Sequence, residues 1–329
     1  HALNPNHPCQ RGSAQNPDIF FQVRESANKF YDEIPEVVVH YMKELEKGSI
    51  NRSERETAFF GGKGINVSFI LKELGHESTA LGFVAGFTGK ALEQGIENKG
   101  LHADFVRLEN GITRINVKIR SGEETDINAQ GPDIKQGDID RLFEKLDRLK
   151  EGDVLILAGS IPKTLPSDIY ERIMERLYGR GVHFVVDATK ELLVNSLKYK
   201  PFLIKPNNDE LSEIFGVEIK TPELSAEYGK KLVKKGASNV LVSMGGKGAV
   251  LCDENGKTHY MPAVGGEAVD TVGAGDSMVA GFIAGYTEKK DYEYALKLGT
   301  AAGAATAFSE GLGTRDKIYE LLHSVQSGE

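Results

Sequence analysis

Short apolar runs alternate with longer amphipathic stretches along most of the chain. The runs are rich in β-branched and aliphatic residues and predict strands near residues 79–84, 153–158, 182–187, 202–205, 239–243 and 248–252. Apolar residues recur with the helical period near residues 66–75, 89–99, 138–149, 166–178, 208–215 and 222–236, and again near 275–286, 291–308 and 315–325. Strands that alternate with helices predict an α/β fold, a doubly wound and mostly parallel sheet flanked by helices.

Residues 112–129 follow a different pattern. Apolar and polar residues alternate over 112–119 and 124–129, and Ser121-Gly122-Glu123 between them is typical of a turn. The pattern predicts a hairpin that stands outside the main sheet as a small β lid.

Residues 1–42 fit neither pattern, because no apolar strand run opens the chain. We therefore expect an atypical N-terminal segment over 1–42 and the main domain over 43–329.

Composition excludes several classes of function. Acidic residues number 48 and basic residues 40, which gives a net charge of -8, so a nucleic-acid partner is not expected. The longest apolar runs, such as Val154 to Ala158, fall far short of the ~20 residues that span a bilayer. Cys9 and Cys252 are too few for a disulfide framework, and no secretory signal is recognisable. A cytoplasmic location and no membrane partner are expected.

The segment Gly273-Ala274-Gly275-Asp276 stands where a helix is predicted to begin. Backbone amides at a helix N-terminus bind anions, and a carboxylate on the first turn is placed to accept a proton from a hydroxyl beside a bound phosphate. The alternative is a tight glycine turn in which Asp276 only caps the helix.

Three further segments have polar residues at predicted strand or helix ends. Gly61-Gly62-Lys63-Gly64 precedes a helix, where Lys63 and Asn66 could bind polyol or phosphate oxygens, although an ordinary helix entry is an equal alternative. The segments 205–210 and 243–248 each follow a strand. Lys205, Asn207 and Glu210 suit a nucleotide phosphate and hydrated Mg²⁺, and the glycines of 243–248 suit phosphates, yet each segment alone is more often a capped turn.

Taken in order, these four segments resemble the ribokinase-like (PfkB) carbohydrate kinases from about residue 42 onward. Within that family the closer match is to bacterial 1-phosphofructokinases and their tagatose-6-phosphate kinase relatives, through Gly61 to Ser68, Thr113 to Val117, Ala158 to Pro162 and Thr271 to Gly281.

The resemblance implies a role for each matched residue. Asp276 would be the catalytic base beside an anion hole of Gly273, Ala274 and Gly275. ATP would contact Lys205, Asn207, Ser243, Gly245, Gly246, Lys247 and Gly248, and Glu210 would act on Mg²⁺ through water. The sugar phosphate would contact Gly62, Lys63, Asn66, Arg114 and Ser160. A guanidinium on the lid hairpin suits a phosphate, which it can clamp with two parallel hydrogen bonds.

The same resemblance implies conversion of fructose 1-phosphate and ATP to fructose 1,6-bisphosphate and ADP. It also implies lid segments near 52–60 and 112–129, through which two chains could pair as a homodimer. The alternatives are a tagatose-6-phosphate kinase and a catalytically impaired protein that binds ATP or a sugar phosphate.

The N-terminus motivates the impaired alternative. Members of the family begin with a strand and a Leu-Asn-Pro-x-x-Asp turn, whereas here Leu3-Asn4-Pro5 has no preceding strand and Pro8 stands where the acid is expected. Residues 11–25 instead resemble an interior piece of pyruvate:ferredoxin oxidoreductases. We therefore expect that a foreign segment replaces the first strand and the sugar-binding acid, with Asp18 as a substitute candidate.

Overall fold

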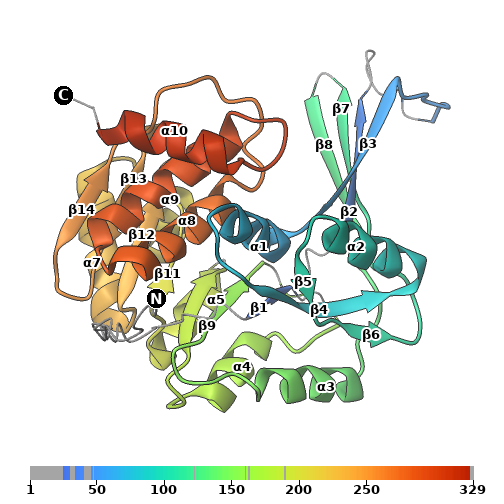
Figure 1. Cartoon of the computed structure of the whole chain (residues 1–329), viewed down its shortest axis with the longest axis horizontal. Coiled ribbons are helices and arrows are strands. Elements are labelled where there is room, and N and C mark those ends of the chain that lie inside the picture. The colour runs from blue at the N-terminus through green and yellow to red at the C-terminus, as the bar shows by residue number, and fades with distance from the viewer. Residues whose placement is uncertain are drawn as a thin grey trace, which may run out of the picture.

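The computed structural model describes residues 25–29, 34–40, 46, 48–121, 123–159, 161, 164–188 and 190–326. A large twisted sheet lies between two layers of helices, and a second, smaller sheet projects from one end of it (Figure 1). The α/β fold predicted from the alternating pattern is confirmed.

Strand β9 (Val154–Ala158) shows why the sheet is covered on both faces. Successive side chains of a strand point to opposite faces. Leu155 and Leu157 belong to the apolar core on one side, while Ile156 belongs to the core on the other side. All three are fully buried. A near-continuous apolar run is therefore a strand between two helical layers.

The main sheet is parallel except at one edge, where β13 and β14 are antiparallel. In spatial order its strands are β14 (Thr258–Met261), β13 (Ala249–Cys252), β12 (Asn239–Ser243), β11 (Leu203–Ile204), β10 (His183–Asp187), β9, β1 (Glu25–Lys29), β4 (Thr79–Ala85) and β5 (His102–Ala103), with β6 (Val106–Leu108) paired to β4.

Helices cover the two faces. One layer contains α1 (Lys63–Glu73), α8 (Ala274–Lys289), α9 (Tyr292–Ala307) and α10 (Arg315–Gln326). The other contains α3 (Gln136–Leu146), α4 (Ile169–Leu177), α5 (Lys190–Ser196), α6 (Asn208–Phe215) and α7 (Pro222–Lys235). Helix α2 (Gly86–Asn98) packs near β4. Two short 3-10 helices, η1 (Leu197–Tyr199) and η2 (Gly245–Lys247), connect elements. None of the described helices has the length and apolar content that crossing a bilayer requires.

Within the N-terminal segment 1–42, β1 occupies a central position between β4 and β9, parallel to both. Its sequence, Glu-Ser-Ala-Asn-Lys, has no apolar run and so gave no strand signal. Backbone groups make the hydrogen bonds of a sheet, so neighbouring strands can recruit a segment of weak propensity. Asn4, Pro5, Pro8 and Asp18 lie outside the described residues.

The small sheet is the expected lid, with strands in the order β3 (Arg55–Gly61), β2 (Ile34–His40), β7 (Asn116–Ser121) and β8 (Glu123–Asn128). Its central strand β2 comes from the segment that sequence analysis set apart as atypical. The predicted first hairpin strand also began too early, since Ile112 to Ile115 lie ahead of β7. Thr113 is buried there, accepting a hydrogen bond from the Ala85 amide at 2.8 Å.

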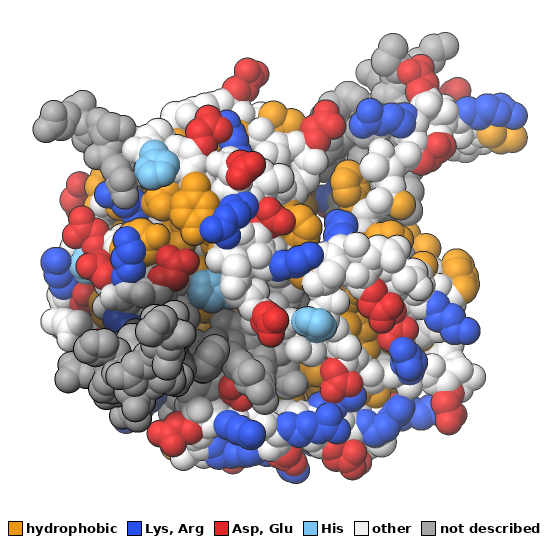
Figure 2. Space-filling model, viewed as in Figure 1, with side chains coloured by type: hydrophobic (Ala, Val, Ile, Leu, Met, Phe, Trp, Pro, Cys, Tyr) orange, Lys and Arg blue, Asp and Glu red, His pale blue; other side chains and the backbone are white. Residues whose placement is uncertain are grey.

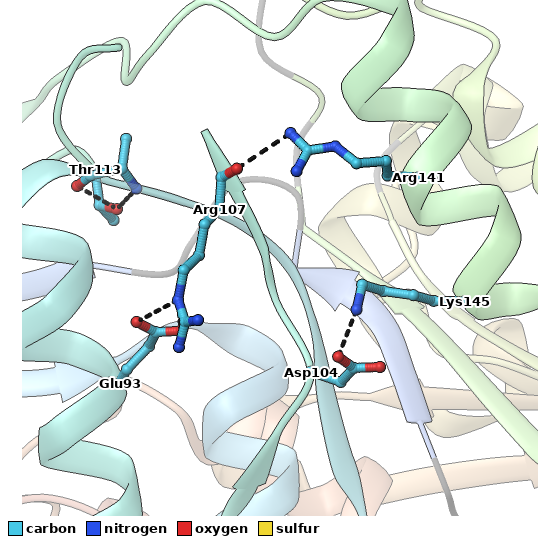
Figure 3. A network of polar contacts seen from close by, with 7 residues as sticks. Glu93, Asp104, Arg107, Thr113, Arg141 and Lys145 are labelled. Atoms are coloured by element: carbon cyan, nitrogen blue, oxygen red, sulfur yellow. Dashed lines mark hydrogen bonds and ion pairs between the residues drawn. The ribbon is translucent and has the colours of Figure 1, made fainter. Parts of the chain in front are cut away.

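Ion pairs and hydrogen bonds of charged side chains link the outer edge of the main sheet to α2 and α3. Figure 3 shows Arg107 of β6 paired with Glu93 of α2, while Arg141 of α3 donates to the Arg107 carbonyl at 3.1 Å. Lys145 of α3 pairs with Asp104 in the same view. On the face seen in Figure 2, basic and acidic side chains are intermixed, which agrees with the absence of a basic stripe in the sequence.

Candidate active site

A cavity of about 570 Å³ lies where the carboxyl ends of β10, β11 and β12 meet the lid. Open parallel sheets bind ligands at this edge, because the strand ends and helix starts gather there. Its walls combine the start of α1, the start of α8, the start of α6 and the inner face of β7 and β8. Of the residues proposed from sequence, it is lined by Gly62, Lys63, Asn66, Lys205, Asn207, Glu210, Ser243, Gly273, Gly275 and Asp276.

Asp276 lies on the first turn of α8 and is only 5% exposed. Gly273 caps the helix with a φ of 79°, a left-handed conformation that glycine adopts without steric cost. The Asn66 side-chain amide of α1 donates to Asp276 Oδ2 at 2.9 Å. Burial and, to a smaller extent, the neighbouring Asp187 raise the pKa of Asp276 to about 6 against the opposing effects of Lys63, Asn66 and Lys205. This carboxyl group therefore changes charge near neutral pH.

Asp187, at the end of β10, joins two lysines of the cleft. Its carboxylate contacts Lys63 Nζ at 3.3 Å and Lys205 Nζ at 3.1 Å. Burial opposes ionisation of Asp187, but the ammonium groups of Lys205 and Lys63 outweigh it and hold the pKa of this carboxyl below its ordinary value. A Cβ atom on Gly275 would lie 3.3 Å from Lys205 Nζ, so this positive charge sits against the start of α8. Two cations and a helix N-terminus thus converge beside Asp276.

A second cavity, of about 470 Å³, shares Ser243 and Gly275 with the first. Its walls include Ala263, Val264, Met278, Ala304 and Phe308, so an apolar group fits here beside the charged cleft. Gly245, Gly246, Gly248 and Ala274 line this cavity. A Cβ atom on Gly248 would lie 2.0 Å from the Met261 carbonyl oxygen, and the φ of 90° also requires glycine.

Asn207 and Glu210 form a reciprocal cap at the start of α6. The Glu210 amide donates to Asn207 Oδ1 at 2.7 Å, and the Asn207 amide donates to Glu210 Oε2 at 2.8 Å. The Ser243 amide donates to the Pro206 carbonyl at 3.2 Å, which joins this cap to the end of β12. Because one carboxylate oxygen already accepts from the backbone, Glu210 fits water-mediated contact with a cation better than direct ligation. Among the described residues, no three His, Cys, Asp or Glu side chains gather as a ready-made metal site.

Three of the proposed residues are not placed in either cavity. Arg114 lies two residues ahead of β7 rather than on the hairpin, with its side-chain carbons near Gly131. Lys247 donates from its ammonium group to the Lys220 carbonyl at 2.8 Å. Ser160 lies outside the described residues.

Sequence reasoning missed five polar residues that line the first cavity: Asp187, Asn116, Lys118, Asp126 and Asn128. Asp187 ends a predicted strand, so the rule that ligands bind at carboxyl ends could have found it. The four lid residues face the cleft through their register, in which Asn116 pairs with Asn128 and Lys118 with Asp126. Lys118 Nζ contacts Asp126 at 3.2 Å. Alternating polar residues in a strand carry no signal of which face meets a ligand.

The arrangement suits transfer of an anionic group to a hydroxyl. A carboxylate with a pKa near 6 can accept a proton, the helix N-terminus and two lysines can stabilise negative charge, and the apolar cavity can hold a planar group beside it.

Comparisons with known proteins agree with this chemistry. The model of the family described as "pfkB family carbohydrate kinase" matches residues 28–318. The chain is 45% identical over 289 residues to a 1-phosphofructokinase of Bacillus subtilis. This match covers 88% of this chain and 94% of that relative. It is 37% identical over 284 residues to a D-tagatose-1-phosphate kinase of Bacillus licheniformis. This match covers 86% of this chain and 93% of that relative. A crystal structure of phosphofructokinase-2 from Escherichia coli in complex with fructose-6-phosphate superposes with a TM-score of 0.84 and 23% sequence identity. The match covers 92% of this chain and 99% of that chain, and it shows that the two share a fold. The second resemblance, over residues 11–25, gains no support from these comparisons.

Proposed function

The chain belongs to the pfkB family of carbohydrate kinases and is a phosphotransferase, and we propose that it phosphorylates the free primary hydroxyl of fructose 1-phosphate with ATP. The products are fructose 1,6-bisphosphate and ADP. The observation that carries this proposal is the buried Asp276 carboxylate at the start of α8, beside Lys63 and Lys205.

Asp276 acts as the general base. It accepts the proton of the attacking hydroxyl while the new O–P bond forms and the bond to the ADP leaving oxygen breaks. A base is most effective when its pKa lies near the working pH, and burial has moved the pKa of Asp276 to about 6. The hydrogen bond from Asn66, at 2.9 Å, orients the carboxylate.

The transferred group lies against the amides of Gly273, Ala274 and Gly275. Phosphoryl transfer depends chiefly on positioning and on stabilising negative charge at the equatorial oxygens. Lys205 lies next to Gly275, and Lys63 is held by the same Asp187 carboxylate, so both lysines are oriented toward this charge.

ATP places its base in the apolar cavity and its phosphates between Ser243, Asn207 and the start of α8. The glycines of η2 leave room for the nucleotide next to the backbone. Mg²⁺ would be held by the ATP phosphates and by water molecules that Glu210 orients, and it would supply further charge neutralisation on the phosphates.

The sugar phosphate lies between Lys63, Asn66 and the inner face of the lid. Lys118 and the amide side chains of Asn116 and Asn128 line this part of the cavity and supply donors for sugar and phosphate oxygens. Arg114, two residues ahead of β7, is a further candidate donor to the substrate phosphate.

D-tagatose 1-phosphate is the second candidate substrate, because a relative that is 37% identical carries that name. Both compounds are ketohexose 1-phosphates. We also propose that two chains pair through their lids, which leave Phe59 of β3 and Ile127 of β8 39% and 54% exposed. Sedimentation of Phe59→Ser and of wild type tests this pairing: a shift to monomer supports it, and unchanged mass refutes it.

The experiment that tests the activity is ADP release from Mg-ATP with fructose 1-phosphate, D-tagatose 1-phosphate, tagatose 6-phosphate and fructose 6-phosphate. Fructose 1-phosphate is expected to give the highest kcat/KM. The Asp276→Asn variant should lose turnover by roughly 10²–10⁴-fold, which is the usual contribution of a general base. Asp140→Asn, on the outside of α3, is the matched control and should retain activity. Binding of ATP without turnover on any of the four sugars would instead establish the catalytically impaired protein.

A further inference from the structure

A third cavity, of about 550 Å³, lies at the opposite edge of the main sheet, at the amino ends of β10 and β11. His183 begins β10 and lines this cavity, whereas Asp187 ends the same strand in the active-site cleft. Four steps of about 3.3 Å separate them, so the two sites lie about 13 Å apart along one strand. The phosphotransferase chemistry does not use this third cavity.

Aromatic rings form much of its wall. Tyr178 and Tyr199 meet edge to face with ring centroids 6.0 Å apart. The ring centroid of Phe202 lies 5.5 Å from that of His183 and 5.0 Å from that of Tyr286. These rings come from the residue after α4, from η1, from β10, from the residue before β11 and from α8. Aromatic side chains from five segments around one opening are suited to a flat, apolar ligand group.

Two lysines from different elements line the same cavity. Lys200 follows η1 and Lys290 follows α8, and both adopt left-handed backbone conformations, with φ of 51° and 53°. Non-glycine residues seldom adopt this conformation. Lys290 Nζ lies 4.9 Å from the centre of the Tyr286 ring. Burial lowers the pKa of Lys290 to about 8. A bound anion would favour the charged form.

A purely structural role explains only part of this arrangement. Lysines at helix C-termini interact favourably with the helix dipole, and both lysines stand at such ends. That role does not account for two cations directed at one cavity with aromatic walls. Polar groups complete the lining: Ser238 and Glu254, whose carboxylate accepts from the Tyr292 hydroxyl at 2.7 Å.

We propose that this cavity binds a planar aromatic anion of about the size of a nucleoside monophosphate. The ring packs among Tyr199, Phe202 and Tyr286, the last of which is itself stacked on Tyr292 with ring centroids 4.9 Å apart, and the anionic group pairs with Lys200 and Lys290. The volume lies within the range of small-molecule sites, about 300–1,000 Å³.

Pyridoxal 5′-phosphate is a suitable probe, because it is a flat aromatic phosphate whose aldehyde condenses with a lysine amine and releases water. Borohydride then reduces the imine to a stable amine, and peptide mapping locates the label. We expect at least tenfold more label on Lys290 or Lys200 than on Lys289, the neighbouring lysine outside the cavity. AMP should protect these lysines at concentrations at least tenfold lower than inorganic phosphate.

Equal labelling of Lys289 and Lys290 would overturn the proposal, and so would equal protection by AMP and inorganic phosphate, which would indicate a simple anion. Tyr286→Leu should raise the protecting concentration of AMP at least fivefold, whereas Tyr294→Leu, on the adjacent helix and outside the cavity lining, should leave it unchanged. Circular dichroism of both variants separates a loss of the site from a loss of the fold. Kinase turnover is not measured, so the outcome is independent of the proposed function.

Discussion

Replacing Asp276 with asparagine is expected to stabilise the fold at neutral pH while it removes phosphoryl transfer. Asp276 is 5% exposed and lies near the ionised Asp187, so its negative charge is costly inside the protein. Asparagine has nearly the same shape and can still accept the hydrogen bond from Asn66.

The size of the effect follows from the pKa. Folding moves the pKa of this carboxyl from 3.8 to about 6. Each tenfold change in proton affinity corresponds to about 1.4 kcal/mol, so the ionised group destabilises the folded state by about 3 kcal/mol at pH 7.5. Because the folded state holds this proton more tightly than the unfolded chain, stability falls as the pH rises from about 4 to about 6. At pH 4.5 only about 1 kcal/mol of the penalty is present.

Urea unfolding at pH 7.5 and at pH 4.5 measures the difference. The gain in unfolding free energy of Asp276→Asn over wild type, which is a gain in stability, should be about 2 kcal/mol larger at pH 7.5 than at pH 4.5. Asp140→Asn removes the same charge from the surface and should change the free energy by less than about 0.5 kcal/mol at either pH. A gain that is equal at both pH values would refute the argument, because only a titrating buried carboxyl predicts the difference. A loss of stability at pH 7.5 would refute it as well.

Three other predictions follow from the site. Asp187→Asn leaves Lys63 and Lys205 without the carboxylate that they share, so the free energy of unfolding should fall by about 3 kcal/mol in chemical denaturation; an unchanged value would show that the two contacts contribute little. In pH–rate measurements, kcat/KM should fall about tenfold per pH unit below about pH 6 as Asp276 becomes protonated, and a flat profile down to pH 5 would exclude it as the base. Gly248→Ala places a Cβ atom 2.0 Å from the Met261 carbonyl, so calorimetry should show ATP affinity reduced at least tenfold. Gly256→Ala serves as the control, because Gly256 has a similar left-handed φ of 80° but its added atom meets open space.

Much of this protein could be predicted from the sequence, because its strongest signals are local. The apolar runs that become β9, β10 and β12 are buried on both faces, so composition alone marks them as interior strands. Glycine before a helix, followed by a first-turn aspartate, predicts an anion site from backbone geometry. The cap formed by Asn207 and Glu210 is local in the same sense, since its two partners stand three residues apart.

The remaining features depend on residues far apart in the chain. Glu25–Lys29 becomes a central strand only because β4 and β9 offer it backbone partners on both sides. The ion pair of Asp187 with Lys63 joins residues 124 positions apart, and the Asn66–Asp276 hydrogen bond spans 210 positions. The raised pKa of Asp276 follows from burial and from Asp187. The class of fold and the residues able to act on phosphate follow from local patterns along the chain. Which charges share one cleft depends on the folded arrangement, because electrostatic interactions vary with distance through space and with exclusion of water rather than with position along the chain.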